Sequence, residues 1–313
     1  MTSPMLLAVG AAHIDRRGQV SGRYLPGASN PGTMREEIGG GVFNALRNAT
    51  RHGVHGALMS LRGGDAASEA VGRAIDEAGI EDLSASFLDR TTPSYTALLD
   101  EEGELIAGFA DMGLYDIGFA KQIRRRKFRD AVGRAEAILC DANMPEAALL
   151  ALMQASAGKP VNAVAISPAK VTRLAPCLDR LACLFMNLRE ARTLSGRPAD
   201  AMPANIAAAI RGMGLASAVI TAGSHPLVGF DLAGMFELVP AAPRQVADVT
   251  GAGDAIAGAT TAIMMQGLPL RQAVRYGMAA AMLTLESRNV VATYSDQDFA
   301  DALALVGEAR AVA

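Results

Sequence analysis

Cysteine is scarce in this sequence, and its scarcity argues against two kinds of protein. Only three of the 313 residues are cysteines, Cys140, Cys177 and Cys183, and their spacing matches no metal-binding pattern. Neither a disulfide-stapled secreted domain nor a cysteine-based metal site is therefore expected. Cys140 stands in an apolar run and is predicted to belong to the core.

A field of positive charge is also missing. The chain has 29 Lys and Arg residues against 32 Asp and Glu residues, a formal net charge of −3. Proteins that bind nucleic acid usually carry a basic patch or stripe. The one basic cluster, residues 124–129, fits an amphipathic helix and is predicted to be a solvated face. We therefore expect no nucleic-acid partner.

Long apolar segments are lacking as well. Residues 5–12 are apolar but too short to cross a membrane, and no charged leader precedes them. The alanine-rich residues 273–285 are interrupted by polar side chains and are predicted to form a buried helix. We expect a cytoplasmic protein that does not bind a membrane.

Short apolar runs separated by helical patterns indicate an α/β protein. Half of the residues are hydrophobic, enough for a large core, and residues 1–313 are interpreted as one domain. Repeated strand–helix units predict a mostly parallel sheet with helices on both faces. The expected strands are residues 6–10, 57–61, 137–140, 161–166, 183–186 and 218–221, with a short strand-like piece at 290–291 before a terminal helix.

Two segments interrupt this alternation. Residues 16–35 are polar and rich in glycine and proline, which predicts a projecting hairpin or loop. Residues 92–109 follow a strand–turn–strand pattern, typical of a hairpin. We expect the two segments, about residues 13–35 and 91–115, to form a small β-sheet lid. Such lids exclude water from phosphoryl donors.

The most informative stretch is Asp248-Val249-Thr250-Gly251-Ala252-Gly253-Asp254, a glycine-bearing turn that opens onto a helical pattern. Glycine allows the backbone to approach a ligand closely, and the first N–H groups of a helix attract anions. A carboxylate beside an anion site makes sense if it accepts a proton from an attacking hydroxyl. A lone Gly-Asp pair would be interpreted instead as a helix N-cap.

Two earlier motifs are candidates for substrate binding. Asp15 follows the first predicted strand, at the edge of the sheet where open α/β proteins bind ligands, although a turn aspartate is an equal alternative. The residues Gly39-Gly40-Gly41 precede a helix, which indicates close approach of the backbone to a ligand or a simple glycine turn. Asn44 falls in the first turn of that helix, where its amide can both donate and accept hydrogen bonds.

Two later motifs are candidates for nucleotide and metal binding. Asn187 and Glu190 lie on one face of a helical turn, where they would hold the water shell of Mg²⁺. The same pair would also form a capping box, the alternative favoured for these residues alone. Thr221 and Gly223 form a Thr-x-Gly turn at a strand end, which offers a hydroxyl and an N–H to phosphate.

Taken in order, these motifs resemble the ribokinase/PfkB family of carbohydrate kinases over essentially the whole chain. The resemblance implies a Rossmann-like, mostly parallel sheet with flanking helices and a small β-sheet lid. The family pattern usually has threonine where this chain has Val249, a position that mainly offers its backbone. Lids of related proteins often pair between subunits, which implies a homodimer.

The resemblance also implies a role for each motif in ATP-dependent phosphorylation of a small sugar or nucleoside. Catalysis is assigned to the base Asp254 and to an anion hole made by the backbone of Gly251, Ala252 and Gly253. Substrate binding is assigned to Asp15, Gly39, Gly40 and Asn44. ATP binding is assigned to Asn187, Thr221, Gly223, Gly251 and Gly253. Mg²⁺, held through water, is assigned to Asn187 and Glu190. A monovalent cation such as K⁺, which many members bind near Asp248, is left open.

Within the family, short segments resemble most the members that phosphorylate the 5′-hydroxyl of pseudouridine. The segments Ser29-Asn30-Pro31-Gly32 and Thr284-Leu285-Glu286-Ser287 carry most of this similarity. The alternatives are a kinase for another nucleoside or for a free sugar such as ribose or fructose. An oxidoreductase is disfavoured because Gly10-Ala11-Ala12-His13 is not a G-x-G-x-x-G turn. A non-catalytic sugar-binding protein is disfavoured because Asp254 and its glycines are present.

Overall fold

The first strand, β1 (Met5–Val9), lies inside the central sheet. In the computed structural model, which describes residues 3–312, β1 pairs in parallel with β4 (His55–Met59) and with β10 (Ala137–Asp141). Its two neighbours therefore come from distant parts of the chain. Strand order reverses direction at β1, and open α/β sheets bind ligands beside such a point, at the carboxyl ends of the strands.

The complete central sheet has ten strands in the order β16-β15-β14-β13-β12-β11-β10-β1-β4-β6. The strands from β6 to β13 pair in parallel, whereas β14, β15 and β16 add antiparallel strands at one edge. The mostly parallel sheet predicted from the sequence is confirmed. The remaining strands are β6 (Glu81–Asp82), β11 (Val161–Val164), β12 (Cys183–Asn187), β13 (Ala218–Ala222), β14 (His225–Asp231), β15 (Gly234–Leu238) and β16 (Arg310–Val312).

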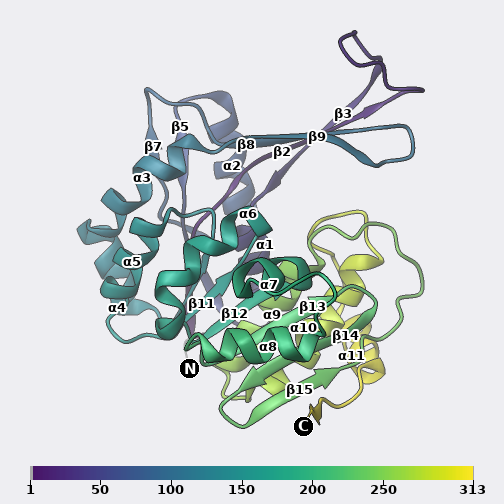
Figure 1. Cartoon of the computed structure of the whole chain (residues 1–313). Coiled ribbons are helices and arrows are strands. Elements are labelled where there is room, and N and C mark those ends of the chain that lie inside the picture. Colours follow the sequence, from purple (N-terminus) through teal and green to yellow (C-terminus); the bar gives the residue numbers. More distant parts are fainter. Residues whose placement is uncertain (1–2, 313) are drawn as a thin grey trace.

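Helices cover both faces of this sheet, as Figure 1 shows. One face carries α3 (Gly113–Ile123), α4 (Arg126–Arg134), α5 (Glu146–Ala155), α6 (Pro168–Val171), the 3₁₀ helix η1 (Thr172–Arg180), α7 (Leu188–Ser195) and α8 (Pro203–Gly212). The other carries α1 (Gly41–Thr50), α2 (Ala66–Glu77), α9 (Ala252–Met265), α10 (Leu270–Leu285) and α11 (Asp296–Leu305). Within residues 3–312, no helix combines the length and the apolar character that a bilayer crossing requires.

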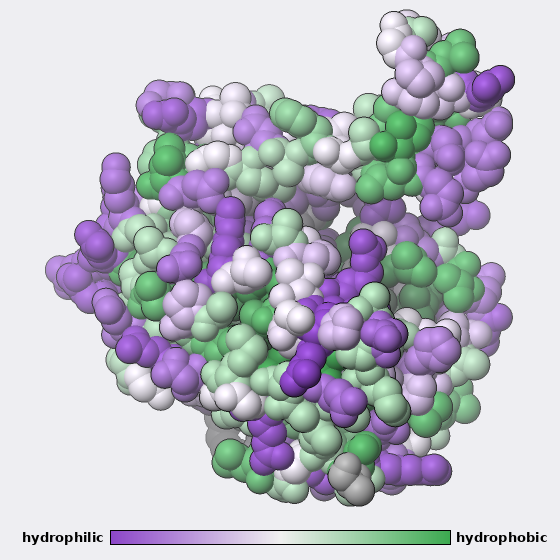
Figure 2. All heavy atoms as spheres, viewed as in Figure 1, coloured by the Kyte–Doolittle hydropathy of each residue, from purple (hydrophilic) through white to green (hydrophobic). Residues whose placement is uncertain are grey.

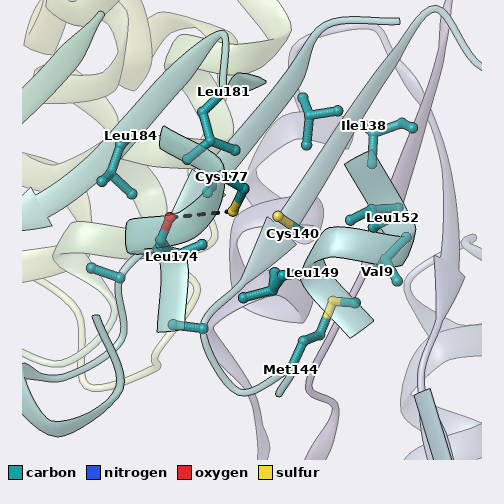
Figure 3. Packing of buried hydrophobic residues seen from close by; sticks show 14 of the residues in the cluster. Val9, Ile138, Cys140, Met144, Leu149, Leu152, Leu174, Cys177, Leu181 and Leu184 are labelled. Carbon is teal, nitrogen blue, oxygen red and sulfur yellow. Dashed lines mark hydrogen bonds between the residues drawn. The ribbon is translucent and has the colours of Figure 1, made fainter. Parts of the chain in front are cut away.

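The two faces form two apolar cores because side chains along a strand alternate between faces. Leu7 and Val9 of β1 pack into the first core, and Leu6 packs into the second. Figure 3 shows part of the first core, where Cys140 and Cys177 lie among leucines and a methionine. Both thiols are buried and free, and the prediction that Cys140 belongs to the core is confirmed.

A second, four-stranded sheet stands off the body and is called the projecting sheet here. Its strand order is β3-β2-β8-β9. The bounds are β2 (His13–Val20), β3 (Gly32–Gly39), β8 (Ser94–Leu99) and β9 (Leu105–Asp111). Both predicted hairpins are present, although β3 runs past residue 35, the expected limit of the first segment. Figure 2 shows an open space between this sheet and the body. A short parallel pair, β5 (Leu61–Gly63) with β7 (Ala85–Phe87), lies near its base.

Two predictions for the surface and the C-terminal region have different outcomes. The basic cluster lies around the start of α4, and Arg125 and Arg126 are exposed, so the solvated face is confirmed. The strand expected at residues 290–291 is wrong, because no strand occurs there. The carbonyl of Val290 instead lies directly against Gly251, so this segment closes over the turn that precedes α9.

Candidate active site

The N-terminus of α9 opens at the carboxyl ends of the central strands. Gly251 is its N-cap and has a left-handed backbone, with φ of 83°, a conformation that glycine adopts most readily. The carbonyl of Gly251 accepts the helical hydrogen bond from the N–H of Ala255 at 2.8 Å. The preceding N–H groups have no partner within the helix and carry the positive end of its dipole. This turn therefore has the geometry that an anion site requires, and anion binding here stays a prediction.

Asp254 lies in the first turn of α9, and its carboxylate is the chemically most unusual group nearby. Its Oδ2 accepts a hydrogen bond of 2.9 Å from Asn44 Nδ2. Burial raises the pKa of Asp254 to about 7; the negative charges of Asp141 and Asp15 add to the rise, and the Asn44 hydrogen bond and the Arg47 charge oppose it. A carboxylate with a pKa near neutrality can accept a proton and release it again at physiological pH.

A short chain of polar contacts orients the Asn44 amide. Arg47 Nη2 donates to Asn44 Oδ1 at 2.6 Å, so the amide oxygen faces Arg47 and the NH₂ group faces Asp254. The Arg47 guanidinium also stacks over the Phe43 ring, 4.7 Å from its centroid. Arg47 was not predicted as a site residue, although its spacing of three from Asn44 on α1 is the signal that would have indicated it.

The glycines that precede α1 allow close approach between parts of the chain itself. A side chain at Gly39 would overlap the carboxylate of Asp15, and one at Gly40 would overlap the carbonyl of Ala11. Gly40 also has φ of 116°. These contacts give both glycines a packing role within the protein, and their assignment to substrate binding stays a prediction. They let the segment before α1 pack closely against Asp15 and Ala11.

Asp141 is a second carboxylate that was not assigned to the site from the sequence. It is fully buried at the end of β10 and accepts hydrogen bonds from the N–H groups of Ala11, Val42 and Asn143 at 3.1, 3.2 and 3.0 Å. Burial raises its pKa, and these N–H groups oppose the rise. Asp141 thus fastens together the loop after β1, the start of α1 and the loop after β10, and its charge contributes to the raised pKa of Asp254.

A cavity of about 170 Å³ adjoins Asp254. Six predicted site residues line it together: Asn187, Glu190, Thr221, Gly251, Gly253 and Asp254. Gly223 lies past the end of β13, in the turn to β14 with φ of 64°, and does not line the cavity. Ile166 does line it, and its φ of 71° is rare for a β-branched residue, which marks local strain beside the site.

Asn187 and Glu190 form the capping box that was the alternative interpretation of this pair. Glu190 N–H donates to Asn187 Oδ1 at 2.9 Å, and Asn187 N–H donates to Glu190 Oε2 at 2.7 Å. Burial raises the pKa of Glu190. Among the described residues, Oε1 of Glu190 takes part in no such bond. An oxygen ligand on the cavity wall suits Mg²⁺, which binds through few carboxylates and keeps much of its water.

Asp248, the first residue of the turn, is bound by the projecting sheet. Its Oδ2 accepts from Arg17 Nη1 at 2.9 Å, and its Oδ1 accepts from the N–H of Thr250 at 2.8 Å. The site therefore has three parts: the acceptor side around Asp15 and Asn44, the anion site at α9, and the cavity beyond it. The projecting sheet contributes residues to the first two.

Comparison with known proteins gives a consistent result. Residues 3–297 match the model of the pfkB family carbohydrate kinases. The pseudouridine kinase of Escherichia coli K12 is 26% identical over 283 residues, which cover 90% of each chain. A carbohydrate kinase structure from Agrobacterium tumefaciens is 41% identical and superposes with a TM-score of 0.87, covering 98% of this chain and 99% of that one. The Arabidopsis thaliana ribokinase complexed with ribose and ATP has the same fold at 20% identity, with a TM-score of 0.85 over 97% and 99% of the two chains.

Proposed function

The chain belongs to the pfkB family of carbohydrate kinases, and we propose that it transfers the γ-phosphoryl group of ATP to the 5′-hydroxyl of pseudouridine. As a family member it is an ATP-dependent kinase of a sugar or nucleoside. The observation that best supports the proposed chemistry is the Asp254 carboxylate, whose pKa of about 7 occurs beside a helix N-terminus. A base and an anion site are then adjacent, as phosphoryl transfer to a hydroxyl requires.

The proposed reaction follows from this adjacency. Asp254 accepts the proton of the acceptor hydroxyl while that oxygen bonds to the γ-phosphorus. The bond from the γ-phosphorus to the bridging oxygen breaks, and ADP leaves. The N–H groups of Gly251, Ala252 and Gly253 stabilise the negative charge that gathers on the transferred group. Asn44, held by Arg47, keeps the carboxylate aimed at the hydroxyl.

In the proposed reaction, the phosphoryl donor ATP binds in the cavity beside Asp254. We assign the phosphates of ATP to the space bounded by Asn187, Thr221 and Gly253, with Gly223 contacting the nucleotide beyond it. Mg²⁺ would be held through water at Glu190 and Asn187, and when bound it neutralises charge on the phosphates. The capping box keeps both side chains in place for that role.

The acceptor side is proposed to bind ribose through Asp15, Gly39, Gly40 and Asn44, with the projecting sheet acting as the lid. Pseudouridine is favoured because a relative named as its kinase aligns over 90% of the chain. A uracil joined through carbon needs a wall beside the ribose, and the projecting sheet is placed to supply one. The runner-up acceptor is another nucleoside or a free sugar such as ribose or fructose.

The outer face of the projecting sheet supports the proposal of a homodimer. Strand register places Met34 and Phe109 on one face, and their exposed fractions are 61% and 70%. Arg17, which contacts the site, lies on the opposite face. A contiguous patch of such side chains is typical of a surface that a partner covers. The molar mass of the protein in solution, measured by light scattering, tests the dimer.

A panel of acceptors tests the substrate. We expect pseudouridine to give the highest kcat/KM with MgATP, above ribose and fructose and above its isomer uridine, in which the same uracil is joined to ribose through nitrogen. The product should carry phosphate at the 5′ position, which phosphorus NMR identifies. The matched control is 5′-deoxypseudouridine, which keeps the base and should bind without being phosphorylated. Turnover of ribose without turnover of pseudouridine would favour the runner-up.

The pKa of Asp254 predicts the pH dependence of the reaction. The base is active when ionised, so kcat/KM should fall below pH 7 by about tenfold per pH unit and level off above it. Because the phosphates of ATP also titrate, MgATP binding is measured over the same range as a control. An acid limb centred near pH 4 would contradict a raised pKa at this carboxylate.

A further inference from the structure

Arg17 connects the projecting sheet to the turn before α9. It lies on β2, and its Nη1 donates to Asp248 Oδ2 at 2.9 Å while its Nη2 donates to Thr250 Oγ1 at 2.8 Å. The guanidinium therefore holds two groups of the same turn in a fork, a geometry that Arg provides and Lys does not. In Figure 1 the projecting sheet lies over the yellow-green region of the chain that precedes α9. The contact spans 231 residues of sequence.

The position of Arg17 relates this contact to the acceptor. Residues two apart on a strand point to the same face, so Arg17 and Asp15 share one face of β2. Asp15 lies beside Gly39 and close enough to Asp254 for its charge to raise the Asp254 pKa. One strand thus carries both an acceptor-side carboxylate and the residue that holds the anion-binding turn.

The charge of Arg17 also argues against a monovalent cation beside Asp248, a site that the sequence analysis did not decide. Both oxygens of Asp248 are engaged, Oδ2 by Arg17 and Oδ1 by the N–H of Thr250. Burial alone would raise the pKa of Asp248, but hydrogen bonds from Thr250 and Arg17 lower it below its ordinary value. The carboxylate is therefore ionised and already paired. The donor set does not fit a cation at Asp248, because a second positive charge there would be repelled by the guanidinium.

We propose that Arg17 is a positioning residue that ties the anion-binding turn to the acceptor strand and replaces a monovalent cation beside Asp248. The proposal rests on the kinase function of this site. It assigns to one side chain two effects that separate experiments can measure. The first is alignment of the turn with the acceptor, and the second is independence from K⁺.

Kinetics of two variants test the alignment. Arg17→Ala should lower kcat by about 10- to 100-fold, the effect of losing two charge-assisted hydrogen bonds. Added guanidinium at millimolar concentration should restore part of the rate, and Arg17→Lys should retain an intermediate rate. The control is Arg126→Ala, which removes an exposed arginine of α4 that pairs with Asp130 at 3.5 Å, away from the projecting sheet. Arg126→Ala should leave kcat unchanged and should not respond to guanidinium.

The rate and the thermal midpoint in different salts test whether the protein needs a monovalent cation. The wild-type rate should be the same in chloride salts of K⁺, Na⁺ and tetramethylammonium at equal ionic strength. The thermal midpoint of the wild-type protein should also be the same in the three salts. In Arg17→Ala, which leaves Asp248 unpaired, K⁺ should raise the midpoint relative to tetramethylammonium. Stimulation of the wild-type rate by K⁺, or equal behaviour of Arg17→Ala and Arg126→Ala, would overturn the proposal.

These measurements separate this proposal from the proposed function. If no acceptor is turned over, the proposed substrate is wrong, while the thermal midpoints still decide the role of Arg17. If Arg17→Ala does not fold, the salt series on the wild type and the rate of Arg17→Lys decide it. If Arg17→Lys were as fast as the wild type, alignment of the turn would not need both hydrogen bonds from the guanidinium.

Discussion

Asp254→Asn is expected to lower kcat by about 10²- to 10⁴-fold, the range over which a general base contributes. The asparagine keeps the shape of the side chain and can still accept the hydrogen bond that Asn44 donates to position 254. It cannot take up the proton of the acceptor hydroxyl. The N–H groups at the start of α9 are unchanged, so affinity for MgATP, measured by calorimetry, should stay near that of the wild type.

The same variant should change stability in a way that depends on pH. The folded-state pKa of Asp254, about 7, lies above the ordinary value of an aspartate. Its contribution to stability is therefore fully present at low pH and is lost as pH rises through 7. Asparagine stays neutral throughout. Asp254→Asn should thus gain on the wild type in thermal midpoint as pH rises from about 4, the ordinary aspartate pKa, to 7, and it should keep that advantage at pH 8.5.

A control variant and two outcomes decide this prediction. Asp130→Asn changes an exposed aspartate on α4 and should alter neither kcat nor the pH dependence of the midpoint. A near-normal kcat for Asp254→Asn would remove the residue from the role of base. A midpoint below that of the wild type at pH 8.5 would mean that the ionised carboxylate stabilises the fold, contrary to a raised pKa.

The central sheet was predictable because its strands are buried on both faces. β1 and β10 appear in the sequence as short, nearly unbroken apolar runs, and a helical pattern follows β10. The projecting sheet was harder to predict in detail. Most of β3 is exposed, so no alternation of apolar and polar residues marks its extent. The edge strand β16 has three residues, two of them exposed, and left no signal in the sequence.

The candidate site was predictable where one local segment carries the geometry. The turn before α9 shows its glycines and its aspartate in sequence, and Asn187 with Glu190 shows a spacing of three. Local spacing could not decide between a capping box and a cavity-lining pair, because the same two side chains satisfy both. Arg17 and Asp141 could not be assigned, since their partners lie far away in the sequence. Only the fold brings those partners together.

Gly251, the N-cap of α9, and Gly253, in the first turn of α9, are expected to differ when each is replaced by alanine. Gly251→Ala places a side chain at φ of 83° and against the carbonyl of Val290, so the free energy of unfolding should fall by about 1–3 kcal/mol. Activity should fall with it, because the turn can no longer hold its conformation. At Gly253 an added methyl group meets no atom within 4 Å, and the fold should tolerate it.

Gly253→Ala should therefore lower activity without lowering the stability of the fold. Gly253 lines the cavity beside Asp254, and a methyl group there would occupy space assigned to the transferred phosphoryl group. We expect kcat to fall by about 10²-fold, comparable to losing one donor of an oxyanion hole. Urea unfolding should give Gly253→Ala the stability of the wild type or slightly more, because alanine favours a helix by up to about 1 kcal/mol over glycine.

Gly133→Ala in α4, where an added methyl group also meets no atom within 4 Å, is the matched control and should keep full activity. If Gly253→Ala were as active as Gly133→Ala, the transferred group would have to bind away from the N-terminus of α9.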